Sequence, residues 1–154
     1  MHFQLNEHHR MIRDSVRRFA ESEIAPQALR LWSEEAFPYS IWKQAGELGF
    51  TGLPYDEAYG GGGGDWLGFT IALEEIARVD CAVAVSLMAN STAASLLSNY
   101  GTDAQKERWL RPILDGRQIG CIGLTEPNAG SDAANIQTRA ERRGERWVVN
   151  GSKT

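Results

Sequence analysis

Apolar side chains recur at helical spacing along the first part of the chain. Ile12, Val16 and Phe19 share one face of a helix that Asn6 can cap, and Pro26 is expected to end or bend this helix. The same spacing predicts four further helices, over residues 40–48, 67–79, 82–97 and 102–115. The stretch over residues 82–97 is apolar on most sides, so we expect it at the centre of a helical core.

Residue types at the predicted helix ends support these boundaries. Gly49 is placed to close the second helix in a left-handed conformation. Thr102 and Gln105 have the spacing of a capping box, in which each side chain accepts a hydrogen bond from the other residue's backbone N–H. The last helix is expected to stop at Asp115-Gly116.

The periodicity changes from helical to strand-like after Arg117. Residues 119–124, 136–141 and 147–149 are predicted β segments, and Asn150-Gly151 predicts a hairpin turn. The predicted fold class is mainly α, with an all-α helical bundle domain followed by the first strands of an antiparallel β domain.

The change in periodicity also predicts two domains, a helical one over residues 1–117 and the truncated start of a β domain over residues 118–154. A strand that pairs across Asn150-Gly151 barely begins before Thr154, which leaves an unpaired edge. We therefore expect the chain to be a piece of a longer protein.

The composition is that of an ordinary globular protein, with 42% hydrophobic and 23% charged residues among 154. With 16 basic and 20 acidic residues the net charge is −4, and no basic stripe is present to neutralise nucleic-acid phosphates. The amino terminus lacks the apolar core of a signal peptide, and no apolar run is expected to span a bilayer. We therefore predict a cytoplasmic protein without a nucleic-acid partner or membrane insertion.

Cysteines and histidines are the first candidates for reactive or metal-binding groups. Cys81 and Cys121 lack CxxC spacing and have apolar neighbours, so we expect both to be buried free thiols. His2, His8 and His9 all lie near the start of the chain, where adjacent histidines point to different helix faces. No metal site is expected from them.

Several other residues have a structural explanation that outweighs a functional one. The glycines at residues 60–64 fit phosphate-loop templates, but no Gly-Lys-Ser/Thr follows and no strand precedes, so a flexible connector is favoured. Glu74 and Glu75 are expected on the solvated side of their helix, and Met88 is expected to pack in the core.

The segment from Gly123 to Asp132 is the strongest functional candidate. A short apolar strand runs directly into a turn in which Thr125 supplies a hydroxyl and Pro127 a fixed φ. Gly130 lets a backbone approach a ligand without a Cβ in the way. Such a corner suits a flat cofactor with a polar edge, although the same residues also make a surface turn whose side chains cap their own backbone.

This string, Gly-Leu-Thr-Glu-Pro-Asn-Ala-Gly-Ser-Asp, resembles the signature of the acyl-CoA dehydrogenase family. Further matching landmarks lie in the same order along the chain: Gly52-Leu53-Pro54, Tyr59-Gly60-Gly61, Leu73 to Arg78, Gly101-Thr102, Gln105-Lys106 and Trp147 to Lys153. Asn135 departs from the pattern, since family members often carry a small residue there. The resemblance covers nearly the whole chain and implies the same fold of an all-α domain followed by a β domain.

The resemblance implies an FAD-dependent enzyme that oxidises an acyl-CoA to a 2,3-enoyl-CoA, by α-proton abstraction and β-hydride transfer to flavin N5. The cofactor-binding residues that it implies are Ile122, Gly123, Leu124, Thr125, Glu126, Pro127, Asn128, Ala129, Gly130 and Ser131. Glu126 is assigned to this segment in an orienting or solvated role and not as a general base. The family's catalytic glutamate belongs to a carboxy-terminal helical bundle outside this sequence, so no catalytic residue and no metal ligand is assigned.

The resemblance also implies a role for individual groups. Backbone N–H groups near Leu124 and Thr125, with the Thr125 hydroxyl, are expected at the pyrimidine edge of the flavin. Gly130 and Ser131 are expected at the FAD pyrophosphate, and Ser131 also faces the CoA part of the substrate. In the family, the helix that carries Met88 borders the acyl-chain pocket. The implied partners are acyl-CoA, an electron-transfer flavoprotein or similar acceptor, and further copies of the chain in a homo-oligomer.

Two other interpretations stay open at this stage. The chain could belong to an acyl-CoA oxidase or a flavin monooxygenase of the same fold, or it could be a non-catalytic, truncated helical module. Coding sequence after Thr154 distinguishes them, because the family continues with Trp-Ile-Thr or Trp-Ile-Ser against the flavin. By itself the chain is expected to bind FAD weakly or not at all and to be inactive.

Overall fold

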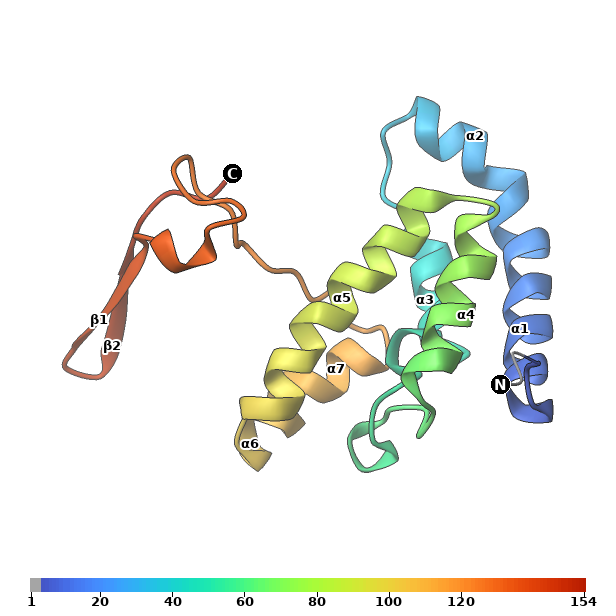
Figure 1. Cartoon of the computed structure of the whole chain (residues 1–154), viewed down its shortest axis with the longest axis horizontal. Coiled ribbons are helices and arrows are strands. Elements are labelled where there is room, and N and C mark those ends of the chain that lie inside the picture. The colour runs from blue at the N-terminus through green and yellow to red at the C-terminus, as the bar shows by residue number, and fades with distance from the viewer. Residues whose placement is uncertain (1–3) are drawn as a thin grey trace. The chain divides into compact units, whose positions relative to one another are not determined.

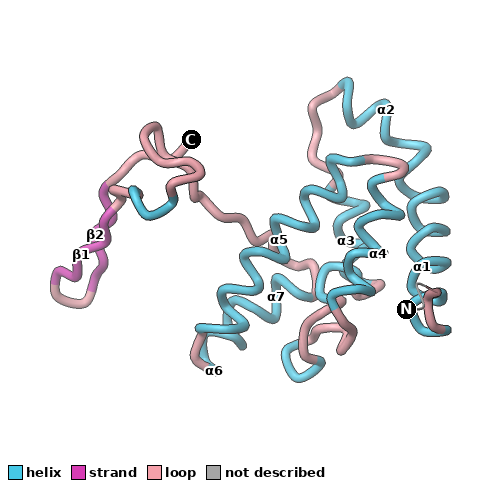
Figure 2. The backbone as a smooth tube through the Cα atoms, viewed as in Figure 1, coloured by secondary structure: helices cyan, strands magenta, loops and turns pink. Residues whose placement is uncertain are grey.

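The structure, a computed structural model, describes residues 4–154 and comprises two compact units, Met1–Cys121 and Ile122–Thr154. The first unit is helical and the second carries a β hairpin (Figure 1, Figure 2). The predicted fold class is confirmed, because a helical bundle is followed by the first strands of an antiparallel sheet. His2 lies outside the described residues.

The first unit consists of helices joined by short turns. In chain order they are α1 (Glu7–Phe19), η1 (Ala20–Ile24), α2 (Ala25–Ser33), α3 (Tyr39–Glu47), η2 (Phe50–Gly52), η3 (Glu57–Tyr59), α4 (Trp66–Ala77), α5 (Cys81–Tyr100), α6 (Asp103–Gln105), η4 (Lys106–Leu110) and α7 (Arg111–Leu114). Of these, η1 and η4 are π-helical turns, whereas η2 and η3 are 3₁₀ turns.

The predicted caps are confirmed. Asn6 accepts a hydrogen bond from the His9 N–H at 2.8 Å and begins α1. Gly49 follows α3 with φ of 78°, a left-handed conformation that glycine adopts without strain. Thr102 and Gln105 form the reciprocal capping box at the start of α6.

The sequence predicts that Pro26 ends or bends the first helix, and of these two outcomes it does not end it, since helical backbone continues from α1 through η1 into α2. In η1 the Ala25 N–H donates to the Ala20 carbonyl, one residue further back than in an α-helix. Pro26 then lies in the first turn of α2, where its missing N–H costs no intrahelical hydrogen bond. In the same way η4 precedes Pro112 at the start of α7. Both prolines are therefore accommodated inside continuous helices.

The core of the helical unit is formed where α1 and α5 pack on either side of α4 (Figure 1). Its fully buried apolar residues include Val16, Ile24, Ile41, Ile76 and Leu87. By length and composition α5 would qualify as a membrane span, with a mean hydropathy of 1.4, which the sequence analysis did not anticipate. It carries buried polar residues and packs against α4, as a core helix does.

The glycines of residues 60–64 form an ordered loop, so the expectation of a flexible connector is wrong. All five backbone N–H groups donate to backbone carbonyls, at 2.8–3.0 Å from the carbonyl oxygens of Glu57, Asp56, Gly52, Tyr55 and Leu53 in turn. Because these N–H groups are already bonded within the protein, the loop has no free amide cradle for a phosphate.

Four side chains differ from the sequence-based expectation in how deeply they are buried. Glu75 is buried, with 5% of its surface exposed, whereas Glu74 is solvated as predicted. Cys81 and Cys121 are free thiols as predicted but are exposed, and Met88 is half exposed instead of lying in the core. Glu75 is buried because Arg17 and Arg78 compensate its charge.

The second unit contains the short turn η5 (Ala133–Asn135) and the hairpin of β1 (Arg139–Arg143) with β2 (Arg146–Asn150). The strands are antiparallel, with Arg139 opposite Asn150 and Arg143 opposite Arg146. The turn of this hairpin is at residues 144–145, where Gly144 has φ of 64°. The Asn150-Gly151 signal lies at the end of β2, and no paired strand follows it among the described residues.

No strand forms over residues 119–124, although the sequence predicts one there, and this holds for all residues that the structure describes. A strand needs a partner for its backbone groups. Here the end of the segment meets only Lys153 and Thr154, through single bonds to Leu124 and Thr125. The segment is therefore extended but unpaired over most of its length.

Candidate functional site

The predicted cofactor segment contains a tight turn that its own backbone closes. The Glu126 N–H donates to the Ala129 carbonyl at 2.9 Å, and the Ala129 N–H donates back to the Glu126 carbonyl at 3.1 Å. Pro127 lies between them and has no N–H to satisfy. The Asn135 amide nitrogen donates to the Asn128 carbonyl at 3.1 Å, so the residue that departs from the family pattern here braces the turn.

The Glu126 carboxylate locks this turn to the rest of the second unit. With only 7% of the residue exposed, it accepts hydrogen bonds from the N–H groups of Gln137 at 2.7 Å and Thr138 at 2.9 Å. Lys153 Nζ lies 3.0 Å from Glu126 Oε1, the oxygen that also accepts from the Thr138 N–H. Glu126 is therefore buried and not solvated, and of the two expected roles the orienting one stays a prediction. All of these partners are the protein's own groups, so the carboxylate acts on the turn and not as a base.

These contacts also control the protonation of Glu126. The nearby Thr138 hydroxyl, the N–H groups of Gln137 and Thr138, and then Lys153 lower the pKa of Glu126 from 4.5 to about 2. Because the folded pKa is depressed, the stabilising contribution is complete above about pH 4.5 and is lost as the pH falls toward 2.

An acid titration followed by NMR tests this arrangement. The amide protons of Gln137 and Thr138 are expected to shift with a midpoint near pH 2, because their acceptor is then protonated. Glu126→Gln is expected to abolish this transition, whereas Glu141→Gln, which alters an exposed carboxylate on β1, is expected to leave it intact. A midpoint near pH 4.5 in the wild-type chain would contradict the buried, bonded carboxylate.

The last two residues hold the extended part of the segment. Lys153 Nζ donates to the Leu124 carbonyl at 2.8 Å, and the Thr154 N–H donates to the Thr125 carbonyl at 3.0 Å. In the sequence, Lys153 stands out only as part of a family landmark, and nothing there places it beside the Leu124 carbonyl. Its nearness could not be read from spacing, because 29 residues separate it from Leu124.

The turn leaves a set of hydrogen-bond donors free. Within residues 4–154, no protein group accepts from the N–H of Thr125, Gly130 or Ser131, and the hydroxyls of Thr125 and Ser131 have no protein partner either. All three residues are exposed, and a Cβ built at Gly130 would meet no atom within 4 Å. These groups fit a flat ligand with acceptor atoms along one edge and an anionic group nearby, as FAD has.

The structure thus gives the ten predicted residues two kinds of role. Glu126 and Ala129 are buried and hold the turn, whereas the other eight are exposed. Among the exposed residues, the N–H groups of Thr125, Gly130 and Ser131 are free, as are those of Ile122, Gly123, Leu124 and Asn128, while Leu124 offers its carbonyl to Lys153. A cofactor is therefore expected to contact the backbone on either side of the turn and not the Glu126 side chain.

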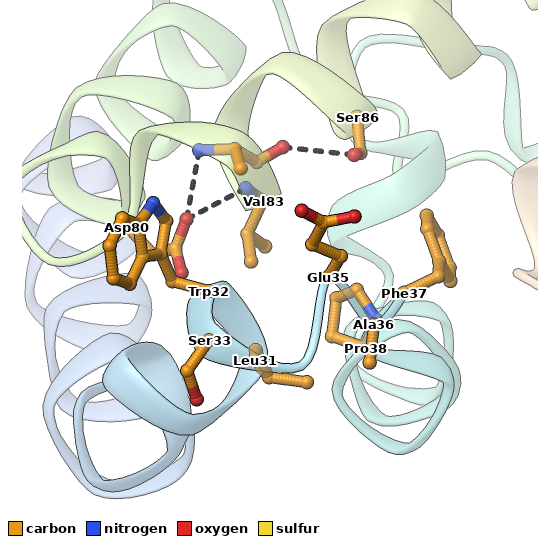
Figure 3. Close-up of a pocket in the computed structure, with 11 residues that line it drawn as sticks. Leu31, Trp32, Ser33, Glu35, Ala36, Phe37, Pro38, Asp80, Val83 and Ser86 are labelled. Atoms are coloured by element: carbon orange, nitrogen blue, oxygen red, sulfur yellow. Dashed lines mark hydrogen bonds between the residues drawn. The ribbon is translucent and has the colours of Figure 1, made fainter.

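A groove in the helical unit is an alternative place for a ligand. It lies between the end of α2 and the start of α5, has a volume of about 720 Å³, and has apolar walls that include Leu31 and Val83 (Figure 3). The Asp80 carboxylate caps α5 by accepting from the Ala82 N–H at 2.8 Å, while the Glu35 carboxylate extends into the groove (Figure 3). No cluster of three or more metal-ligating residues occurs in the described part of the chain.

Comparison with protein families finds two matches along the chain. The family described as "Acyl-CoA dehydrogenase, N-terminal domain" matches residues 6–117, and "Acyl-CoA dehydrogenase, middle domain" matches residues 121–154. Together the two matches include the whole cofactor segment and all but three residues between Asn6 and Thr154.

Curated and solved proteins of this family are similar along nearly the whole chain. The short-chain specific acyl-CoA dehydrogenase of Clostridium acetobutylicum is 43% identical over 154 residues, which cover 99% of this chain and 41% of that protein. A glutaryl-CoA dehydrogenase of Mycobacterium smegmatis solved in complex with FADH2 is 31% identical, with a TM-score of 0.91 over 97% of this chain and 39% of the other.

A second similar structure is described as the electron transferring flavoprotein of Acidaminococcus fermentans. It is 38% identical with a TM-score of 0.94, and the match covers 99% of this chain and 40% of the other. The chain therefore spans about two fifths of the length of the relatives it matches. The residue signature, the fold and the two family matches agree, and the chain belongs to the acyl-CoA dehydrogenase family.

Proposed function

We propose that this chain forms part of an FAD-dependent acyl-CoA dehydrogenase, in which residues 122–131 bind the cofactor. The observation that carries the proposal is the turn whose Glu126 carboxylate is bonded internally while the donors of Thr125, Gly130 and Ser131 are free. This division is what a cofactor site requires, because the support is rigid and the donors are unoccupied by protein.

Each free group has a physical role in this proposal. The Thr125 N–H and hydroxyl donate to the pyrimidine edge of the flavin, where negative charge collects on reduction. The N–H groups of Gly130 and Ser131 donate to the pyrophosphate, and Ser131 also faces the CoA part of the substrate. FAD, when bound, supplies the acceptor for the hydride of the acyl-CoA β carbon. The chain's contribution is to orient the two ligands against each other.

The proton that leaves the α carbon is not assigned to any carboxylate of this chain. Glu126 is unsuited to take it, because its pKa of about 2 makes it a weak base and its oxygens are already bonded. We propose a glutamate of the carboxy-terminal bundle for this step, as the family resemblance implies. An electron-transferring flavoprotein is the proposed electron acceptor, and a cytoplasmic homo-oligomer the proposed setting.

Titration with FAD tests the proposed function. The chain alone is expected to bind FAD weakly or not at all and to show no turnover. The same chain joined to the remaining length of the Clostridium acetobutylicum relative is expected to bind FAD stoichiometrically and to oxidise a short-chain acyl-CoA. If the joined protein folds but binds no FAD, the chain is a non-catalytic helical module; turnover by the 154 residues alone would also refute this account.

Gly130→Ala is expected to weaken FAD binding in the joined protein about tenfold, since a methyl group would separate the backbone from the pyrophosphate. The substitution is expected to leave the melting temperature unchanged, because the added Cβ meets no protein atom within 4 Å. Flavin fluorescence and thermal unfolding measure the two effects separately. Unchanged FAD affinity would remove Gly130 from the site.

A further inference from the structure

Lys153 and Thr154 hold two successive peptide groups, Leu124–Thr125 and Thr125–Glu126. Lys153 Nζ donates to the Leu124 carbonyl at 2.8 Å, and the Thr154 N–H donates to the next carbonyl, that of Thr125, at 3.0 Å. The N–H of Thr125 belongs to the same peptide group as the Leu124 carbonyl. It meets no protein acceptor among residues 4–154, so a cation binds one end of a peptide dipole whose other end is free.

The surroundings of Lys153 keep its ammonium at this carbonyl. Its side chain is 32% exposed and is also paired with the buried Glu126 carboxylate at 3.0 Å. Its Cγ lies 3.5 Å from a Cβ built at Gly123, so the stem packs along the segment. The ammonium is therefore fixed by three contacts within the second unit and is not a mobile surface charge.

We propose that Lys153 is a positioning residue that aims the Thr125 N–H and strengthens it as a hydrogen-bond donor. A cation bonded to a carbonyl oxygen draws electron density from the peptide, and the N–H of that peptide becomes a better donor. The inference rests on the proposed function, in which this N–H faces the flavin's pyrimidine edge. A stronger donor there favours the reduced cofactor over the oxidised one.

Three substitutions separate charge from geometry. Lys153→Met removes both the charge and the hydrogen bond, Lys153→Gln keeps a neutral donor, and Lys153→Arg keeps a charged one. Lys43→Met is the matched control, because it removes an exposed lysine that pairs only loosely with Glu47, at 3.8 Å.

The first measurement is the ¹⁵N–¹H spectrum of the 154-residue chain, which requires no cofactor. The amide nitrogen of Thr125 is expected to shift upfield in Lys153→Met, to shift less in Lys153→Gln, and to stay near its wild-type position in Lys153→Arg and Lys43→Met. Signals of the paired β1 and β2 residues report whether the second unit stays folded. If Lys153→Met unfolds the second unit, the Thr125 shifts of Lys153→Gln and Lys153→Arg are compared with each other, and an upfield shift in Lys153→Gln alone supports the inference.

The second measurement uses the chain joined to the remaining length of its relative, with oxidised and reduced FAD as probes. In Lys153→Met the preference for reduced over oxidised FAD is expected to fall about tenfold, which corresponds to about 30 mV for a two-electron couple. An equal loss of affinity for both forms, or an unchanged Thr125 resonance in a folded variant, would overturn the inference. If no FAD binds at all, the proposed function fails while the spectrum still decides the effect on Thr125.

Discussion

Replacing Gly61 with alanine is expected to lower the unfolding free energy of the helical unit by about 3 kcal/mol. The new Cβ would overlap the Tyr55 carbonyl oxygen and lie 2.8 Å from the Tyr55 Cβ. Neither atom can rotate away. Tyr55 is itself fixed, because it is buried and its hydroxyl donates to the Ser91 carbonyl at 2.5 Å. The loop therefore moves only if this buried hydrogen bond breaks.

Thermal unfolding measures the effect, with an expected fall in melting temperature of about 10 °C. Gly60→Ala is the matched control in the same loop. A Cβ there comes no nearer than 3.7 Å to Arg111, but φ of 85° is strained for alanine, so about 1 kcal/mol is expected from conformation alone. Equal melting temperatures for the two variants would show that the close approach to Tyr55 can relax.

Glu75→Gln is expected to destabilise the helical unit by about 2 kcal/mol at pH 7. The Glu75 oxygens accept from Arg17 Nη2 at 2.7 Å, from Arg17 Nε at 2.9 Å and from Arg78 Nη1 at 2.7 Å. A neutral amide cannot compensate both guanidinium groups. The arginine side chains are 41% and 52% exposed, so water screens part of the interaction and the loss is smaller than for a fully buried pair.

The ion pairs of Glu75 with Arg17 and Arg78 also predict that the stability of the helical unit depends on pH. Hydrogen bonds from Arg17, with those from Arg78, lower the pKa of Glu75 from 4.5 to about 2, although burial opposes this shift. The contribution is therefore complete above about pH 4.5 and is lost as the pH falls toward 2. Urea unfolding at several pH values is expected to show a weaker dependence in Glu75→Gln than in Glu74→Gln, which alters the exposed neighbour. Identical dependence in the two variants would exclude Glu75 as its source.

The helical half of the fold could be predicted from the sequence because its signals are local. Periodic apolar residues mark the buried faces, and the groups that end each helix lie within a few residues of the groups they satisfy. The Asn6 cap, the left-handed Gly49 and the Thr102–Gln105 capping box are all confirmed for this reason. Pro26 was expected to end or bend the first helix, but the π-helical turn that precedes it could not be predicted, because such a turn changes the spacing by a single residue and has no simple sequence pattern.

The β half depends on pairing that a local pattern does not specify. Residues 119–124 have the composition of a strand but lack a pairing partner among the described residues, so they stay extended without a ladder. Gly144-Glu145 joins β1 to β2, with Ala140 opposite Val149 and Arg142 opposite Trp147. The sequence pointed to Asn150-Gly151 as the hairpin signal, but a turn there needs a further strand to pair with β2.

The candidate cofactor segment was proposed from the sequence, but the contacts that support it could not be. The donors of Thr125, Gly130 and Ser131 lie in the signature itself and are free, as the cofactor hypothesis requires. Glu126 was expected to be orienting or solvated, and its buried partners at residues 137–138 and 153 become visible only in the folded unit. The burial of Glu75 could not be predicted for the same reason, since its partner Arg17 is 58 residues away in the sequence.

In the two π-helical turns, η1 and η4, a change in the number of residues is expected to disturb the fold more than a change of residue type. Deleting any one residue from Ala20–Ile24 would restore ordinary helical spacing and bring the Pro26 ring against the carbonyl four positions earlier. Codon-sized deletions in these turns are therefore expected to be far less tolerated than substitutions at the same positions.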